Sequence, residues 1–418
     1  MADKARKDAP TIDFEVIEDI DSRLNSARDK NGNIWLLGQY NLTLGMLIRF
    51  MNLVIRGNRP AFKEINVHGG KQYLPASKLG YYFKGIHGFL EVYSRDLVFA
   101  PHIQVHFNVY RRHPIRYCVL DSPNRISHSG EPEARVFEDF IAKLREEGER
   151  INVKKKVADW QRNYKKNSRR LRQYEAYLYR KYARLVWIRI DFLYKKTCVT
   201  DQQINEIDAT LQSIAIRDQA KYLDGKEDVG ERETIARVDI KEMMSDRDHL
   251  FENMRGKPSL FEHLAGHIWS LEWSRIGGYH MHCALAFDGS KVHKHEWLAD
   301  QIGEYWVNVI TNGRGWYHNC NRGAYRDYVL GPVEYHETDK RERLLKRLEY
   351  LAKKDQFVYV KPSVKCKLFG TGRLPKVAEG GSGRPRGKGT VAPKTLAKGS
   401  ETEPSSDKTD GDWGPYRN

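Results

Sequence analysis

Long apolar segments are absent from this chain of 418 residues. A membrane-spanning helix needs about 18 or more consecutive apolar residues, and the best stretch here, LTLGMLIRFMNLVI, is interrupted by Arg49. The first ten residues, MADKARKDAP, contain no apolar signal core. These absences predict a cytoplasmic protein that is neither inserted in a membrane nor exported.

Cysteine is scarce as well. The chain has five, which lie far apart, form no C-x-x-C motif and cannot all be paired: Cys118, Cys198, Cys283, Cys320 and Cys366. Such spacing is typical of a reducing compartment and argues against a zinc site built from cysteines.

Acidic residues are too few to balance the basic ones. The chain has 71 Lys and Arg against 55 Asp and Glu, which gives a formal net charge of +16. A polyanionic partner is therefore expected, with nucleic acid as the first candidate and an anionic membrane surface as the second. A hydrophobic content of 40% is enough for two packed domains with some chain left over.

Residues 1–150 mix helical and strand patterns and carry no recognisable chemistry. Amphipathic patterns predict helices around 42–56 and 77–97, and the alternating HIQVHFNVY predicts a strand at 102–110. This N-terminal region has no assigned role, and DNA recognition is one option. At the other end, residues 371–418 are rich in Gly, Pro, Lys and Ser, a composition that predicts a disordered tail with a basic first half.

A strongly basic helical segment is predicted at 151–184. It holds about a dozen Lys and Arg against two acids, with Trp and Tyr interleaved. Its cations suit DNA phosphates, and the central ones are the candidates: Lys165, Lys166, Arg169 and Arg170. The alternative is a solvated helix. For the aromatic rings, packing on a neighbouring domain is favoured over stacking on bases.

Residues 185–365 predict an α+β domain. The order is strand, helix, strand, strand, helix, which indicates a split βαβ sheet with helices on one face and a polar face left open. The three strand segments are RLVWIRIDFLY, GHIWSLEWS and YHMHCALAF; a Gly/Asn/Tyr-rich loop, NGRGWYHNCNRGAYRDY, and a helix, TDKRERLLKRLEYLAKKD, follow later.

Two histidines point to the polar face of this sheet. His280 and His282 are two residues apart in a strand and so share one face. Glu272 becomes the cross-strand partner of His280 if the intervening hairpin loop has an odd number of residues, which Gly277 and Gly278 favour. Two imidazoles and a carboxylate suit Mn²⁺ or Mg²⁺. The alternative is a pair of ordinary surface or half-buried histidines.

A tyrosine on the last predicted helix faces cations. The helix has an apolar stripe of leucines, and Tyr350 lies on the other side with Lys346, Lys353 and Lys354. A free phenol has a pKa near 10, and adjacent ammonium groups or a metal favour its phenolate form. Tyr350 is thus a candidate nucleophile, with a surface tyrosine as the alternative.

Arg189 and Asp191 share the polar side of the first strand of this domain. They are candidates for DNA positioning or for support of the metal ligands. A salt bridge on an exposed strand explains them equally well.

These residues resemble a known family. The segments YHMH and YLAK, with the preceding Glu272, are similar to the motifs of HUH endonucleases, which initiate rolling-circle replication of phages and plasmids. Over roughly 180–360 the chain more closely resembles the inovirus-type replication proteins of the YagK/YfjJ C-terminal family. The resemblance implies a ferredoxin-like HUH domain, a divalent metal and strand- and site-specific nicking of DNA in a bacterial cytoplasm.

The resemblance also implies roles for individual residues. His280, His282 and Glu272 would hold the metal, Tyr350 would form a 5′-phosphotyrosine and release a 3′-hydroxyl, and Lys353 would hold the phenolate or the phosphate. The DNA-binding candidates on this domain are Arg189, Lys346 and Lys354. The expected partners are single-stranded and origin DNA with a host helicase and polymerase. The alternatives are a relaxase or transposase of the same chemistry and a catalytically silent DNA-binding regulator.

Overall fold

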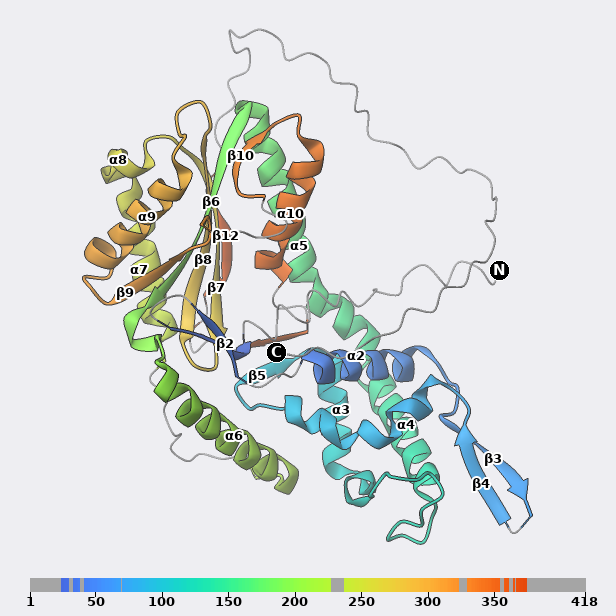
Figure 1. Cartoon of the computed structure of the whole chain (residues 1–418). Helices are drawn as coiled ribbons and strands as arrows, with labels where there is room; N and C mark the ends of the chain where they lie inside the picture. The colour runs from blue at the N-terminus through green and yellow to red at the C-terminus, as the bar shows by residue number, and fades with distance from the viewer. Residues whose placement is uncertain are drawn as a thin grey trace, which may run out of the picture. The chain divides into compact units, whose positions relative to one another are not determined.

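An antiparallel sheet of six strands forms the centre of the predicted 185–365 domain in the computed structural model (Figure 1). The three long strands are β6 (Arg184–Tyr194), β7 (Leu264–Ser274) and β8 (Gly278–Asp288). The strand order is β10-β6-β8-β7-β12, and β9 also pairs with β6. The short strands are β9 (Gly315–Asn319), β10 (Gly331–Glu334) and β12 (Phe369–Thr371). The chain is therefore of mixed α and β structure with antiparallel sheets, as its α+β pattern predicts.

The structure describes residues 24–29, 33–37, 41–68, 70–226, 237–322, 329–353, 357–360, 364 and 366–373. They belong to one compact unit, Met1–Lys376. None of the helices in these ranges is both long and apolar enough to cross a membrane.

Helices cover both faces of the sheet, not one as predicted (Figure 1). On one face, Ile188, Phe192 and Met281 pack against α7 (Ile240–Asn253) and α9 (His295–Tyr305). On the other, α5 (Val153–Lys181) and α10 (Thr338–Lys353) pack on Trp187, Ile268 and Ala284. Because α5 and α10 bury the apolar side chains of the second face and exclude water from them, only the polar part of that face can form a site.

The connection from β6 to β7 is helical, as expected. It contains α6 (Asp201–Asp224), α7 and the short α8 (Pro258–Phe261). Thr200 caps the start of α6, where its hydroxyl and the side chain of Gln203 form a capping box.

A separate hydrophobic core lies within the N-terminal region. Its helices are α2 (Asn41–Arg56), α3 (Pro101–Arg112) and α4 (Glu133–Arg150), with a largely exposed hairpin of β3 (Phe62–Val67) and β4 (Gly70–Pro75). Two 3-10 helices, Lys78–Gly85 and His87–Val92, replace the helix predicted at 77–97. Strand β5 (Leu97–Phe99) pairs with β11 (Val358–Val360), so a segment that follows α10 in the sequence also contributes to this core.

The strand predicted at 102–110 is wrong, because these residues form helix α3. Its side chains are buried around most of the helix, including Ile103, Val105 and Phe107, so apolar residues at alternate positions do not mark a two-sided strand here. Pro101 occupies the first turn, where its missing N–H costs nothing.

The basic segment forms one long helix, α5, as predicted. The side chains of its Tyr174 and Tyr179 are buried, and its Trp160 packs against Tyr359, so these rings of α5 pack against the rest of the protein. The Gly/Asn/Tyr-rich segment is not wholly a loop, since Gly315–Asn319 forms β9. The predicted tail begins within β12, whose Thr371 pairs with Ile268; residues 374–418 lie outside the described residues.

A small N-terminal hairpin consists of β1 (Ser26–Arg28) and β2 (Ile34–Leu36). Backbone hydrogen bonds attach it to the 185–365 region: Val199 N–H donates to Arg28, and Arg275 N–H donates to Leu24.

Candidate functional site

The β7–β8 hairpin places Glu272 directly opposite His280. Ser274 pairs with Gly278, so the loop between them has three residues, 275–277, an odd number. Gly278 adopts a φ of +69°, and a Cβ atom there would lie 2.6 Å from the backbone of Val238. Only glycine fits both conditions, and the hairpin thereby fixes the register that brings the carboxylate to the histidines.

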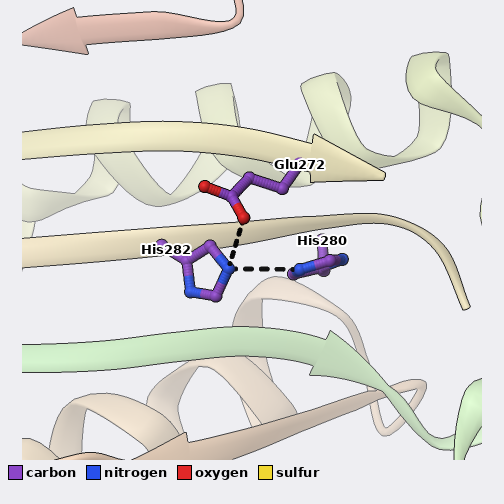
Figure 2. Close-up of side chains that lie close together, drawn as sticks. All are labelled: Glu272, His280 and His282. Atoms are coloured by element: carbon purple, nitrogen blue, oxygen red, sulfur yellow. Dashed lines mark hydrogen bonds and ion pairs between the residues drawn. The ribbon is translucent and has the colours of Figure 1, made fainter. Parts of the chain in front are cut away.

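Glu272, His280 and His282 form a cluster of potential metal ligands (Figure 2). One donor atom from each lies within 4.8 Å of the other two. The two Nε2 atoms are 3.2 Å apart, and Nε2 of His282 is 3.1 Å from Oε2 of Glu272. Glu272 and His282 are buried and His280 is half-buried, so the cluster is largely withdrawn from bulk water.

Asp191 supports this cluster from the neighbouring strand β6. It pairs with His282 across the two strands, and Nδ1 of His282 lies 2.5 Å from its carboxylate. A carboxylate on one ring nitrogen fixes the tautomer and orients the other nitrogen, which is a common arrangement behind metal-binding histidines. Asp191 therefore holds Nε2 of His282 toward Glu272 and His280.

Electrostatics distinguish the two histidines. Burial opposes charge on His282, but the carboxylates of Asp191 and Glu272 outweigh it and raise the pKa of His282 to about 9. Burial lowers the pKa of His280 to about 4, helped by the charge of His282. Burial would raise the pKa of Asp191, yet His282 and Arg189 hold it well below its usual value. Two anionic groups therefore flank the imidazoles and favour a positive charge between them.

These residues line one cavity that also contains Tyr350. The cavity holds about 180 Å³, and its walls come from the β1–β2 hairpin, the sheet and α10. Because liquid water occupies about 30 Å³ per molecule, this space accommodates several water-sized groups. The sequence-predicted nucleophile and the sequence-predicted metal ligands thus lie around the same space.

Among the described residues, three tyrosines line the cavity, and they differ in burial and contacts. Tyr194 donates its hydroxyl hydrogen bond to Asp246, and burial raises its pKa. Tyr194 and Tyr279 are both buried in the core between the sheet and α7 and α9. Tyr350, by contrast, is only partly buried and belongs to α10.

The turn of α10 that carries Tyr350 is tied to α5. The buried carboxylate of Glu349 accepts hydrogen bonds from Ser168 at 2.8 Å and from Arg172 at 2.5 Å. Further along, Arg341 pairs with Glu175, so the two helices run antiparallel. Lys346 is exposed on α10. The side chain of Lys353 and the whole of Lys354 lie outside the described residues.

The cationic candidates on α5 lie beside this turn and not in the cavity. All four are exposed, and they flank Ser168, which contacts Glu349: Lys165, Lys166, Arg169 and Arg170. Arg189 lines the cavity, where its guanidinium lies 3.4 Å from Asp191 and 3.4 Å from His282.

Sequence reasoning missed Arg28. Its guanidinium lies 3.5 Å from Asp191 and lines the cavity, although the two residues are 163 positions apart. No local pattern in residues 24–29 indicates this contact. For Asp191, the alternation of β6 was the available signal, since it places the carboxylate on the same face as the histidines.

Comparison with known proteins gives no relative for this chain. No family model matches it, and neither the curated proteins nor the solved structures contain a match. The chemistry of the site is therefore argued from its own residues.

Proposed function

We propose that this protein is a metal-dependent endonuclease that nicks single-stranded DNA through Tyr350 and initiates rolling-circle replication. The observation that carries the proposal is the shared cavity: Tyr350 lines the same space as His280, His282 and Glu272. A nucleophile beside a two-histidine, one-carboxylate cluster is the combination on which the resemblance to HUH endonucleases depends.

The sheet supports the same assignment. Strand, helices, two strands, helix and strand follow in the order of a split βαβ fold, and the strand between β6 and β7 is β8. In this arrangement β6 and β8 are the adjacent central strands, and they carry Asp191 and the two histidines. We assign the domain to the ferredoxin-like HUH class on this basis.

The donor set fits a divalent ion such as Mn²⁺ or Mg²⁺. Ligands about 2.1 Å from an ion and at right angles to each other are about 3.0 Å apart, and the two separations in the cluster are 3.2 and 3.1 Å. His280, His282 and Glu272 would hold the ion, with Asp191 behind His282. When bound, the ion supplies positive charge that polarises a phosphodiester and stabilises charge that develops on it.

Tyr350 supplies the nucleophile. Its phenolic oxygen forms a bond to phosphorus while the bond from phosphorus to the 3′-oxygen breaks, and the proton lost by the phenol is balanced by one gained at the 3′-oxygen. The products are a 5′-phosphotyrosine and a free 3′-hydroxyl, which a host polymerase extends after a helicase opens the duplex. The reverse attack by a 3′-hydroxyl rejoins the strand without a nucleotide cofactor.

Single-stranded DNA enters at the cavity, and the neighbouring basic surface of α5 holds phosphates. Four exposed cations lie within one helical turn of Ser168, the residue of α5 that contacts Glu349: Lys165, Lys166, Arg169 and Arg170. The rings of α5 are half-buried or buried, so this surface offers cations without a stacking platform. Contacts to a duplex backbone beside the nick fit that chemistry better than contacts to splayed bases.

The test is a covalent adduct. Purified protein is incubated with Mn²⁺ and an end-labelled library of single-stranded oligonucleotides, and adducts are separated on a denaturing gel. We expect adducts from the parent protein and from Tyr81→Phe, an exposed tyrosine elsewhere, and none from Tyr350→Phe or after chelation of the metal. Equal nicking by Tyr350→Phe would exclude this nucleophile.

Two other outcomes identify the alternatives. Duplex binding without nicking by any variant would indicate a catalytically silent DNA-binding regulator. Transfer of the cleaved end to an unrelated target strand would indicate a transposase, and cleavage restricted to a transfer-origin strand would indicate a relaxase.

A further inference from the structure

The N-terminal hairpin forms part of the cavity wall. Ser26, Ala27, Arg28 and Ile34 line the same space as the imidazoles and Tyr350. A segment near the amino terminus therefore closes one side of a cavity whose other described lining residues follow position 188.

The hairpin is held in place on two sides. Val199 N–H donates to the carbonyl of Arg28 at 3.0 Å, and Arg275 N–H donates to Leu24 at 2.9 Å. Asp29 forms a parallel bridge with Val199, and Ala27 packs in a small apolar cluster with Val199 and Ile276. Backbone contacts on both sides of Arg28 fix the direction in which its side chain leaves the strand.

The guanidinium of Arg28 is only partly satisfied by protein. Its side chain is 19% exposed, and the sole hydrogen-bond acceptor found for it within the described residues is Asp191, at 3.5 Å. Arginine carries five N–H donors, so most of its donors are left for another acceptor. At 3.5 Å the hydrogen bond from Arg28 to Asp191 is long and therefore weak, so it does not by itself explain why an arginine occupies this position.

Two guanidinium groups, those of Arg189 and Arg28, share the one carboxylate of Asp191. Its single carboxylate meets His282 at 2.5 Å, Arg189 at 3.4 Å and Arg28 at 3.5 Å. Removing Arg28 would still leave two basic partners on this carboxylate. The guanidinium therefore adds positive charge to the cavity wall beside the ligand cluster, which favours an anion in the cavity.

We infer that Arg28, acting with Arg189, forms an anion subsite that holds a DNA phosphate in this cavity. Strands β1 and β2, which supply Arg28 and Ile34 to the cavity wall, are then part of the reaction site and position the backbone of the strand to be cut. The inference rests on the proposed nicking for the identity of the anion as a DNA phosphate. Arg28 and Arg189 bind the backbone and take no part in bond making.

The experiment measures binding of a fluorescent dT12 oligonucleotide to the full chain with Mn²⁺ at several NaCl concentrations. Loss of one charged phosphate contact in Arg28→Gln is expected to raise the Kd roughly tenfold. It should also make the slope of log K against log salt shallower by about 0.7, the value for one phosphate of a single strand. Arg28→Lys keeps the charge and should retain the parent slope. Arg59→Gln, which removes an exposed cation of the same region, should match the parent in both respects.

A second measurement separates binding from a structural role. Titration calorimetry with Mn²⁺ should give Arg28→Gln the parent affinity, because Asp191 keeps His282 and Arg189 as partners. Weaker Mn²⁺ binding with an unchanged salt slope would show that Arg28 only supports Asp191, and would overturn the inference. Binding of dT12 by Arg28→Gln equal to that of Arg59→Gln would also overturn it.

Failure of the proposed function gives a different result. A parent protein that forms no adduct with DNA yet binds dT12 through Arg28 would refute nicking and leave the anion subsite in place. A parent that forms the adduct while Arg28→Gln binds normally would refute the subsite alone.

Discussion

The hydroxyl of Ser168 on α5 donates a 2.8 Å hydrogen bond to Glu349 on α10. Glu349 is buried and immediately precedes Tyr350, so this contact and the one from Arg172 hold the turn that carries the proposed nucleophile. These contacts from α5 therefore help to position the side chain of Tyr350 on α10.

Replacing Glu349 by Gln should loosen this turn. A buried group that loses a charged hydrogen bond costs about 1 to 3 kcal/mol, so we expect the free energy of unfolding in urea to fall by that amount. Adduct formation should fall more in kcat than in KM, because the phenol is displaced while the DNA surface is retained.

Glu342→Gln is the matched control, since Glu342 pairs with the same Arg172 but is 62% exposed. Exposed ion pairs contribute at most about 1 kcal/mol. Equal effects of the two substitutions on adduct formation would contradict a positioning role for Glu349.

Asp191→Asn should weaken metal binding. The carboxylate that orients His282 becomes a neutral amide, and losses of such supporting groups reduce metal affinity by roughly 10- to 100-fold. Titration calorimetry with Mn²⁺ measures the change. Asp121→Asn removes an exposed carboxylate paired with Arg125 and should leave the affinity unaltered. Parent-like Mn²⁺ affinity in Asp191→Asn would exclude the supporting role.

The basic surface of α5 should contribute a salt-dependent part of duplex binding. A variant with Lys165, Lys166, Arg169 and Arg170 changed to Gln keeps a good helix former at each position. Each lost contact to B-DNA reduces the slope of log K against log salt by about 0.9, so we expect the loss of four contacts to make the slope shallower by about 3.6 in fluorescence anisotropy.

The control for this surface removes the same charge from exposed residues elsewhere: Lys241, Arg255, Lys291 and Lys294. It should keep the parent slope. If both sets lower the slope equally, the effect comes from net charge and not from a defined surface. A flat salt dependence of the parent would contradict nucleic-acid binding altogether.

Two buried histidines should make the N-terminal core sensitive to acid. Burial lowers the pKa of His106 to about 3 and that of His102 to about 4 from an ordinary 6.5. The unfolded chain takes up protons below about pH 6.5 while the folded chain does not, so stability is full above that pH and falls as the pH decreases. For His106 the loss is about 3 kcal/mol by pH 4.5.

His106→Leu cannot take up this proton, so its unfolding free energy should depend less on pH between 6.5 and 4.5. His68→Leu changes an exposed histidine and should follow the parent profile. Chemical denaturation at each pH measures both. Parallel profiles for the parent and His106→Leu would show that His106 is protonated in the folded core.

The sequence predicted the proximity of Glu272, His280 and His282 better than it predicted the surrounding fold. The alternation of β8 and the glycines of the hairpin favoured the register that places Glu272 opposite His280, because a strand and a three-residue loop are local structures, and the structure has this register. The leucine stripe of α10 likewise located Tyr350 on the other side of the helix. Local sequence patterns could not predict the position of Arg28, because its contact with Asp191 joins two segments that are 163 residues apart in the sequence.

Two of the errors in the predicted fold have identifiable causes. Helix α3 is buried on several sides, so its apolar residues satisfy a strand pattern as well as a helical one. The face predicted to be open carries Trp187, Ile268 and Ala286 beyond the polar cluster. These apolar side chains have to be shielded from water, and α5 and α10 cover them. In the sequence, Trp187 on the otherwise polar side of its strand was an indication of this apolar region.

The measurement that tests the account most directly is mass spectrometry of the adduct. Trypsin cuts after Arg347 and Lys353, so the proposed nucleophile lies in the peptide LEYLAK. After nuclease digestion of the bound DNA, we predict that this peptide carries a nucleotide 5′-phosphate on Tyr350. A nucleotide found instead on Tyr194, Tyr279 or any other residue, with LEYLAK unmodified, would contradict the central claim.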